Sequence, residues 1–231
     1  SINMNNIALI PVRSGSTRLK LKALEEIEGE TLLSITLKKA TNSHLFDEVV
    51  CLGDSAIFQQ IAEKNNVSYY QRSDENASNN AKSDEVILEA INKIKPDNIY
   101  WLNLTHPFTS LATIQKVVQI LDNPKSKTDS VFTTHSWLSH ASFSDSLDQP
   151  INYDFEHSFS QTQSMKKIVL ITYGIMAWNA SAFLERYHSK GAAMLNGKVE
   201  TVNVSRLESI WIKNQEDIDM VRSIISKDGL L

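Results

Sequence analysis

The sequence predicts an α/β protein in which helices cover both faces of a mostly parallel β-sheet. Short apolar runs alternate with longer amphipathic segments along the first part of the chain, and each run is joined to the next by a stretch long enough for a helix. Parallel strands need such connections, because a tight turn would reverse the chain direction. We therefore expect a Rossmann-like three-layer sandwich.

The predicted elements follow from hydrophobic spacing. Residues 7–10 form an apolar run that Pro11 ends, and Leu33, Leu37 and Ala40 recur at helical spacing in the next segment. Ser83 is a candidate N-cap for a helix that begins beside it, and Asn179 is a candidate cap for a later short helix. The predicted order is strand 7–10, helix 31–42, strand 47–52, helix 55–65, strand 67–71, a helix from Ser83, strand 98–103, helix 110–121, and strand 129–134, followed by strand 168–177, strand 198–204 and helix 215–226.

Composition limits the classes of partner. The chain has 231 residues and a net charge of −4, which gives no general attraction to nucleic acid. It contains one cysteine, Cys51, within an apolar run, so an internal disulfide is excluded and a core position is expected. No apolar stretch is long enough to span a membrane, and no signal peptide is recognisable. We expect a soluble, cytoplasmic protein without a nucleic-acid or membrane partner, folded as a single domain over residues 1–231.

A basic, hydroxyl-rich loop follows the first predicted strand. In an open α/β sheet, ligands bind at the carboxyl ends of the strands, and backbone N–H groups with Arg and Lys side chains suit phosphate oxygens. The loop contains neither a P-loop nor a Gly-x-Gly-x-x-Gly motif, so a solvated connection is the alternative. Its basic and hydroxyl residues, with one glycine among them, are Arg13, Ser14, Gly15, Ser16, Thr17, Arg18, Lys20 and Lys22.

Residues 137–167 differ from the rest of the chain. They are polar and rich in aromatic residues but lack helical or strand periodicity, so we expect an arm, a lid or an interface. The aromatic residues have no predicted core to enter, which favours a homodimer built through this segment. His135, His140 and His157 match no standard metal-binding spacing and are expected at the surface or the interface.

The run Ile-Pro-Val-Arg-Ser-Gly-Ser-Thr-Arg-Leu, with Lys22, Gly29 and Leu32-Leu33 after it, resembles the N-terminal signature of the sugar-acid cytidylyltransferases, which include the CMP-sialic acid and CMP-Kdo synthetases. The resemblance implies the nucleotide-diphospho-sugar transferase type of fold, with a dimerisation arm at 137–167. It implies CTP and a small acidic sugar-like acceptor as ligands. The residues it assigns to the nucleotide are Arg13, Ser14, Gly15, Ser16, Arg18, Lys22, Arg72, Ser83 and Asn103. Those it assigns to the acceptor are Asn103, His106 and Tyr173.

His106 and Asn103 lie in the segment that resembles the family's Leu-Gln-Pro-Thr-Ser-Pro-Leu-Arg. Asn103 occupies the Gln position and Thr109 the Arg position, so both side chains are shorter here. His106 is a candidate general base or ligand, and a structural role is the alternative.

The metal motif of the family, Asp-Ile-Asp before the last helix, is changed. Trp211 and Lys213 occupy its two acidic positions. Mg²⁺ requires oxygen ligands, so it is a possible cofactor whose usual ligands are absent. Lys213 is instead a candidate catalytic residue, together with Arg13 and Lys22, that supplies charge without coordination. A literal Asp-Ile-Asp at 217–219 falls inside the last predicted helix, where acids complement the helix dipole.

Two functional hypotheses follow. The leading one is a CTP-dependent cytidylyltransferase that converts an acidic sugar, or a similar acceptor, into its CMP conjugate with release of pyrophosphate. The alternative is a catalytically degenerate nucleotide-binding or assembly subunit of the same fold, which the changes at Trp211, Lys213, Ile171 and Thr109 favour.

Overall fold

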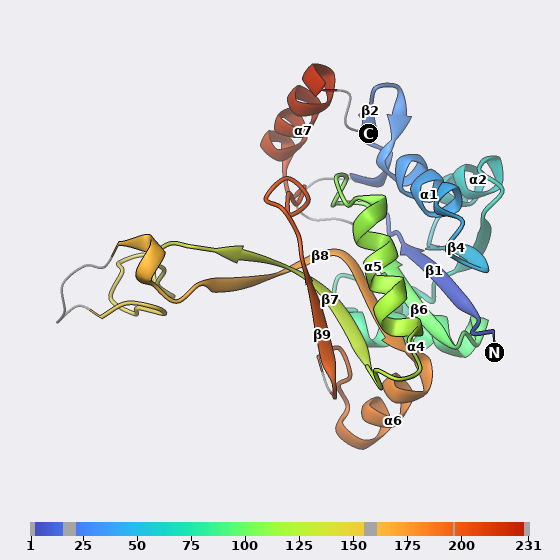
Figure 1. Cartoon of the computed structure of the whole chain (residues 1–231). Helices are drawn as coiled ribbons and strands as arrows, with labels where there is room; N and C mark the ends of the chain where they lie inside the picture. The colour runs from blue at the N-terminus through green and yellow to red at the C-terminus, as the bar shows by residue number, and fades with distance from the viewer. Residues whose placement is uncertain (1–2, 16–21, 155–160, 196, 229–231) are drawn as a thin grey trace.

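A seven-stranded, mostly parallel sheet forms the centre of the molecule (Figure 1). The computed structural model describes residues 3–15, 22–154, 161–195 and 197–228. In sheet order the strands are β5 (Ser68–Gln71), β4 (Glu48–Gly53), β1 (Asn6–Pro11), β6 (Asn98–Leu102), β8 (Ile168–Asn179), β7 (Ser130–Trp137) and β9 (Val199–Asn203). β8 runs antiparallel to both of its neighbours, and the other pairs are parallel. The α/β prediction is confirmed.

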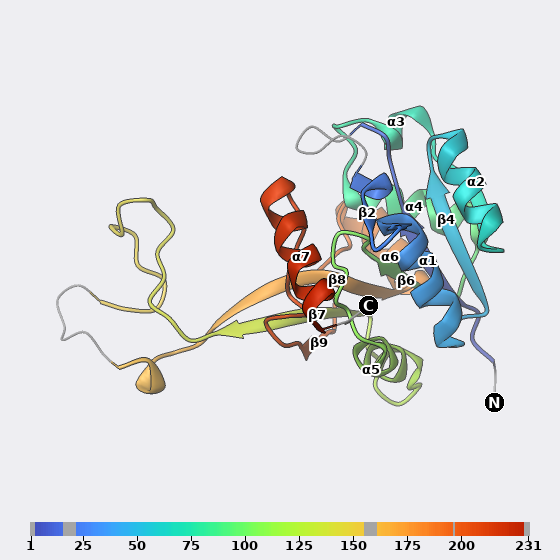
Figure 2. The same cartoon turned by 90° about the horizontal axis from the view of Figure 1, so that it is seen from above.

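β7 and β8 continue beyond the sheet as a projecting hairpin arm (Figures 1 and 2). Their pairing extends outward to Trp137 opposite Ile168. An isolated antiparallel bridge, Ser142 with Pro150, lies further along the arm. The segment 137–167 thus protrudes as expected, but its base is regular sheet. His157, and two of the aromatic residues expected in the arm, lie outside the described residues.

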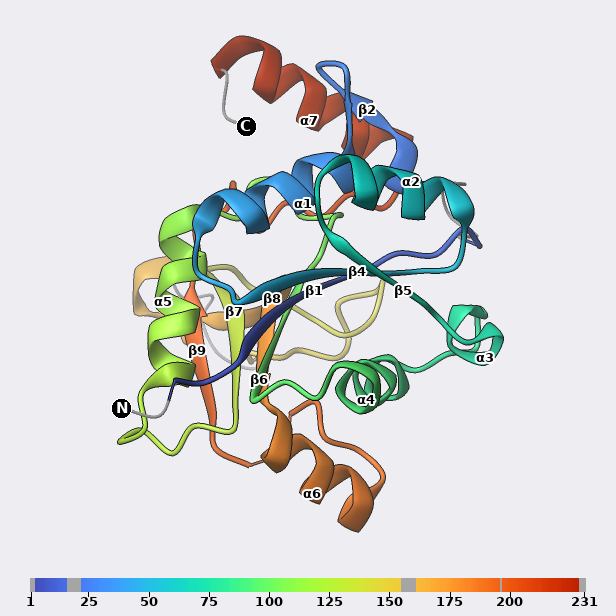
Figure 3. The same ribbon diagram turned by 90° about the vertical axis from the view of Figure 1, so that its right-hand side faces the viewer.

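The helices form the two outer layers (Figure 3). They are α1 (Leu32–Ser43), α2 (Ala56–Lys64), α3 (Asp74–Ala77), α4 (Ser83–Ile94), α5 (Leu111–Asp122), α6 (Ala180–Lys190) and α7 (Gln215–Asp228). One hydrophobic core joins α1, α2, α5 and α7 to one face of the sheet, and a second joins α4 and α6 to the other face. The three-layer prediction is therefore confirmed.

β1 is buried on both faces. Ala8 and Ile10 point into the first core, whereas Ile7 and Leu9 point into the second, and all four have no exposed surface. This explains why the strand is a continuous apolar run, as parallel strands covered on both faces are. Cys51 of β4 is fully buried as expected, and burial raises the pKa of its thiol to about 12.

Some local structure differs from the sequence prediction. A short antiparallel pair, β2 (Glu26–Ile27) and β3 (Glu30–Thr31), precedes α1, and α3 lies in a stretch expected to be irregular. Ser83 is the first residue of α4 and not its N-cap, which is Lys82; the backbone N–H of Lys82 donates to Glu85 Oε2 at 3.3 Å. The β2–β3 pair and α3 are too short for hydrophobic periodicity to be recognisable in the sequence.

Gly174 allows the loop that follows β6 to pack directly on β8. A Cβ at this position would lie 2.3 Å from Thr109 Oγ1, closer than any van der Waals contact. The β7–β8 register also shifts here, between Phe132 and Thr133, so that β8 carries extra residues beside the loop. The backbone N–H of Asn103 donates to the Gly174 carbonyl at 3.1 Å.

No helix among the described residues has the length and apolar character needed to cross a membrane.

Candidate functional site

Two cavities lie at the edge of the sheet where the parallel strands end. The first, here called the Arg72 cavity, has a volume of about 290 Å³ and is bounded by the loops after β1 and β5. Its lining residues are Pro11, Arg13, Arg72, Ser78, Asn79, Ala81, Ser83, Val86 and Trp101. The second, the Trp211 cavity, lies on the other side of β6 and is described below. β6 lies between them: Trp101 of β6 lines the first cavity, and His106, in the loop that follows β6, lines the second.

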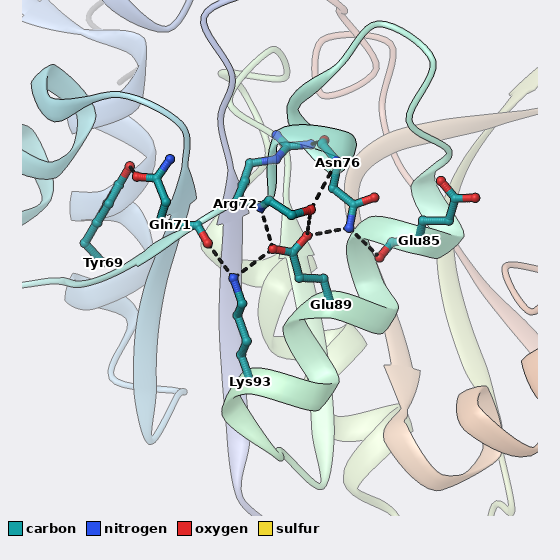
Figure 4. Close-up of polar contacts among 8 residues, drawn as sticks. Tyr69, Gln71, Arg72, Asn76, Glu85, Glu89 and Lys93 are labelled. Atoms are coloured by element: carbon teal, nitrogen blue, oxygen red, sulfur yellow. Dashed lines mark hydrogen bonds and ion pairs between the residues drawn. The ribbon is translucent and has the colours of Figure 1, made fainter.

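A polar network holds the backbone around Arg72 (Figure 4). Glu89 of α4 accepts hydrogen bonds from the Ser73 backbone N–H (2.7 Å), from Asn76 Nδ2 and from Lys93 Nζ (2.8 Å). Burial alone would raise the pKa of Glu89, but these hydrogen bonds lower it below its ordinary value. Lys93 Nζ also donates to the Gln71 carbonyl at 2.5 Å. The end of β5 and the start of α3 are thereby fixed to α4.

Arg72 presents a buried cation to this cavity. Its side chain is only 6% exposed, and Nη2 donates to the Asn76 carbonyl at 2.6 Å. No described residue accepts a hydrogen bond from Nε, although that atom is buried. Burial lowers the pKa of Arg72, with a partial offset from the Asp54 carboxylate, yet a guanidinium stays charged at neutral pH. A buried cation with an unused donor is suited to an anionic ligand.

The loop after β1 closes the other side of the Arg72 cavity. Arg13 Nη1 donates to Asn79 Oδ1 at 2.6 Å and also contacts the Gly15 carbonyl. The Ser14 backbone N–H and hydroxyl donate to Asp54 at 3.0 Å, which ties the loop to the end of β4. The structure therefore brings together Arg13 and Arg72, two of the cations expected at the nucleotide.

Other residues expected at the nucleotide have different positions. Ser83 lines the Arg72 cavity. Lys22 begins a short 3₁₀ helix, η1 (Lys22–Leu24), and lines neither cavity. Asn103 also lines neither, because its Oδ1 accepts from the Thr105 backbone N–H (3.2 Å) and hydroxyl (2.7 Å) in a local turn. Ser16 and Arg18 lie outside the described residues.

The Trp211 cavity is larger, about 710 Å³, and has a largely apolar wall. β7, β8 and the segment after β9 supply the wall, and α7 closes one end. Its lining residues are His106, His135, Trp137, Leu170, Ile171, Thr172, Tyr173, Arg206, Leu207, Ser209, Ile210, Trp211, Lys213, Asp217 and Met220.

His106 is the centre of an aromatic cluster at one end of this cavity. Its ring stacks on Trp211, with centroids 5.9 Å apart and planes 19° apart, and meets Tyr173 edge-on at 6.2 Å. The Tyr173 backbone N–H donates to His106 Nε2 at 3.4 Å. Trp211 is held there because the backbone N–H of the next residue, Ile212, donates to the Thr105 carbonyl at 2.9 Å.

The environment of His106 opposes catalysis by proton transfer. The residue is 3% exposed, and burial lowers its pKa to about 3, with a smaller contribution from the charge of Lys213. An imidazole with such a low pKa accepts a proton poorly at neutral pH. In the structure His106 contacts Tyr173 and Trp211, an arrangement that agrees with the structural alternative for this residue.

Lys213 lies beside Trp211 and not in the Arg72 cavity. Its Nζ is 5.0 Å from the centre of the Trp211 ring and 4.0 Å from Asp217 Oδ2, and its side chain is 42% exposed. Asp217 Oδ2 in turn accepts the backbone N–H groups of Lys213 (2.7 Å) and Asn214 (3.2 Å), while Asn214 Oδ1 accepts from the Asp217 N–H (3.0 Å), which is a capping box at the start of α7. Asp217 thus lies in the first turn of α7, where an acid was expected to complement the helix dipole, and the ammonium of Lys213 is partly solvated.

The residues around Trp211 do not fit the divalent-ion site that the sequence resemblance implies. An indole and an ammonium occupy the two positions, and neither offers an oxygen ligand. Across the described residues, no three His, Cys, Asp or Glu side chains are grouped so that they could hold an ion. We therefore derive no chemical step through a metal.

Sequence reasoning missed several residues that line the cavities. Asn79 and Trp101 line the first, and Trp137 and Arg206 line the second. The two tryptophans lie at the carboxyl ends of β6 and β7, so strand-end position was a usable signal. Arg206 follows β9 without any motif around it.

The chain is similar to known proteins in sequence and in fold. The family model described as Cytidylyltransferase matches residues 7–225. Pseudaminic acid cytidylyltransferase from Campylobacter jejuni is 26% identical over 171 residues, which cover 71% of this chain and 74% of that protein. A 3-deoxy-manno-octulosonate cytidylyltransferase from Christiangramia forsetii is 23% identical, with 95% and 96% covered. The solved structure of CMP:2-keto-3-deoxy-manno-octonic acid synthetase complexed with CTP is similar in fold, with a TM-score of 0.71 at 14% identity and with 96% and 99% covered.

The burial of His106 predicts how stability depends on pH. The unfolded chain takes up a proton on this imidazole below about pH 6.5, whereas the folded protein does so only near pH 3. Stability is therefore lost as the pH falls between these values. One pKa unit corresponds to about 1.4 kcal/mol, so between pH 7 and pH 4 we expect His106→Gln to lose about 3 kcal/mol less than the wild type.

Urea unfolding at a series of pH values measures this difference. His188→Gln, which changes an exposed imidazole on α6, is the matched control and should follow the wild type. Equal acid sensitivity in His106→Gln and the wild type would contradict a buried, neutral His106.

Proposed function

The chain belongs to the cytidylyltransferase family, and we propose that it transfers CMP from CTP to an acidic sugar-like acceptor with release of pyrophosphate. An acceptor oxygen attacks the α-phosphorus and gives up its proton, a new P–O bond forms, and the bond from the α-phosphorus to the β-phosphate bridge breaks. Protein groups accelerate such a transfer mainly by positioning the reactants and by stabilising charge.

The observation that carries this proposal is the Arg72 cavity. It combines a buried cation that has an unused donor, a second cation in Arg13, and the aromatic side chain of Trp101 in its lining. These are the groups that hold a phosphate chain and a flat base. We assign Arg13 and Arg72 to the phosphates, with Ser14, Gly15 and Ser83 beside the nucleotide. Ser16, Arg18 and Lys22 keep their assignment to the triphosphate on the resemblance alone.

We assign the Trp211 cavity to the acceptor. It lies across β6 from the Arg72 cavity at the same edge of the sheet, so an acceptor there can approach a bound nucleotide from the other side of one strand. Tyr173 and His106 line this cavity, whereas Asn103 lines neither cavity and its Oδ1 accepts hydrogen bonds in the local turn. The family match favours an active enzyme over the degenerate alternative.

Pyrophosphate release tests the activity. Purified protein with CTP should release pyrophosphate when a 2-keto-3-deoxy sugar acid is added, and Arg13→Gln should require more CTP for half-maximal rate. GTP with the same acceptors is the control. The proposal fails if CTP with a panel of such acids, with Mg²⁺ or Mn²⁺ present, gives no release above the rate without an acceptor.

We propose that Lys213 supplies positive charge at the place where the related metal motif has carboxylates. Lys213 lines the Trp211 cavity, which we assign to the acceptor, and in this proposal its ammonium stabilises charge that develops while the acceptor attacks. The stacked ring of Trp211 and the carboxylate of Asp217 limit where the ammonium can move. The side chain is too exposed to act as a buried charge, so the expected effect is moderate.

Lys213→Ala should lower kcat about tenfold or more, which corresponds to about 1.4 kcal/mol, and should leave the affinity for CTP within about twofold. Lys116→Ala, a change at an exposed residue of α5, is the control. Equal kcat values for Lys213→Ala and the wild type would rule out the charge proposal. CTP titration with and without EDTA adds a second readout, because loss of binding on chelation would show that ion ligands exist elsewhere in the chain.

We also propose that two copies of the chain associate through the arm. Apolar side chains are exposed along it, notably Phe143 (78%), Leu147 (60%) and Val169 (58%). An exposed apolar surface on a projecting hairpin is costly unless another surface covers it, and a second identical arm is the simplest partner.

Light scattering after size-exclusion chromatography should therefore give a dimer mass at micromolar concentration. Replacing Phe143 and Leu147 together by Asp should give a monomer that keeps the fold. In the matched control, Asp replaces Ile57 and Leu111, which are also exposed but lie on α2 and α5. This variant should remain dimeric. A monomeric wild type, or a dimer that survives the arm substitutions, would contradict this assembly.

A further inference from the structure

We propose that Asp54 is a positioning residue for the nucleotide, because it holds the loop after β1 where Arg13 and Arg72 line the same cavity. Its carboxylate acts through Ser14 and does not itself touch the ligand. This inference rests on the proposed function and adds to it the residue that sets the shape of the phosphate site.

The carboxyl end of β4 holds both walls of the Arg72 cavity. The Leu52 carbonyl accepts from the Val12 backbone N–H at 2.9 Å, and the Gly53 carbonyl accepts from the Arg72 backbone N–H at 2.7 Å. A Cβ at Gly53 would lie 2.8 Å from Tyr69 Cε2 and 3.2 Å from Val12 Cγ1, so a side chain here would displace both neighbours. The two walls are therefore attached to the same point of the sheet.

Asp54, the next residue, extends this attachment into the loop after β1. Its Oδ1 and Oδ2 accept the Ser14 backbone N–H at 3.0 and 3.1 Å, and Oδ2 also accepts the Ser14 hydroxyl at 3.0 Å. Hydrogen bonds to a charged acceptor are stronger than those to a neutral one, so this carboxylate fixes the backbone directly after Arg13. From that position Arg13 Nη1 donates to Asn79 Oδ1 at 2.6 Å.

Ser14 contributes to the nucleotide site indirectly. Its backbone N–H and its hydroxyl both donate to Asp54, so in this arrangement neither group is directed to a phosphate. Among the residues that the structure describes, Asp54 does not line the Arg72 cavity. The pair of Ser14 and Asp54 thus determines where Arg13 lies, and it acts from outside the cavity.

The charge of Asp54 has a second effect on the same site. Burial lowers the pKa of Arg72, the Asp54 carboxylate raises it, and the charge of Arg13 lowers it again. Asp54 therefore offsets the repulsion between two cations that lie close together before a ligand binds. Once a triphosphate is bound, the same carboxylate repels it. Charge and position therefore act on nucleotide affinity with opposite signs.

Calorimetric titration with CTP separates the two effects by their sign. If only charge mattered, Asp54→Ala and Asp54→Asn would both bind CTP more tightly than the wild type. We expect instead that Asp54→Ala raises the Kd about tenfold, because the contacts to Ser14 are lost. Asp54→Asn should raise it about threefold, because its amide oxygen still accepts the Ser14 N–H.

Glu63→Ala is the matched control for this titration. It removes an exposed acid from α2, the helix that follows Asp54, and should bind CTP as the wild type does. An unchanged or lower Kd in both Asp54 variants would overturn the proposal.

A double variant tests whether Asp54 acts through Arg13. In an Arg13→Gln background, Asp54→Ala should change the Kd for CTP by less than about twofold, because the side chain that it positions is already lost. The same tenfold loss in both backgrounds would contradict this route.

Hydrogen–deuterium exchange tests the loop without any ligand. The amides of residues 12–15 should exchange about tenfold faster in Asp54→Ala than in the wild type, whereas those of α5 should not change. Equal exchange in residues 12–15 would show that Asp54 does not hold the loop and would overturn the proposal. Faster exchange in every segment would mean that Asp54→Ala has lost its fold, and the Kd of Asp54→Asn then decides.

Failure of this inference can be separated from failure of the proposed function. If the wild type releases pyrophosphate but both Asp54 variants bind CTP as well as it does, the positioning role is wrong and the activity stands. If the wild type binds CTP without releasing pyrophosphate, the proposed function fails, and a higher Kd in the Asp54 variants still supports the inference. Absence of CTP binding to the wild type would overturn both.

Discussion

The close approach of β8 to the loop after β6 determines the shape of one end of the Trp211 cavity. It requires a residue without a side chain at Gly174, because any Cβ would occupy the space of the Thr109 hydroxyl. Once the two backbones are in contact, Tyr173 can donate to His106, and the His106 ring forms the surface on which Trp211 stacks. The aromatic end of the Trp211 cavity therefore follows from one backbone contact.

The two cavities use positive charge in different ways. Arg72 is buried, held by a network of hydrogen bonds and only partly satisfied, so a ligand there meets a cation that has already lost its water. Arg206 and Lys213 remain partly solvated and are limited mainly by the indole rings beneath them. A preorganised, desolvated charge attracts an anion more strongly than a solvated surface cation does.

The sequence was sufficient for the sheet and its helices, because β1, β4 and β6 are continuous apolar runs and the helices that cover them are amphipathic over three turns. It was insufficient for the site wherever position depends on contacts distant in sequence. His106 was a candidate general base in the sequence, and only the structure shows that it is buried and stacked on Trp211. Asn103 follows β6 as expected, but its Oδ1 accepts hydrogen bonds from Thr105 in a local turn. No motif surrounds Arg206 in the sequence. Only the structure shows that it lies beside Trp137 of β7.

Cys51 gives this chain a practical advantage for spectroscopy. A thiol with a pKa of about 12 holds almost no thiolate at pH 7 or 8, and it has no surface exposed to a reagent. The sequence contains no other cysteine. A cysteine introduced at an exposed position will therefore be the one that reacts with a maleimide or a spin label while the protein stays folded. Distances between labelled sites can then be measured without first removing a native thiol from the centre of the sheet.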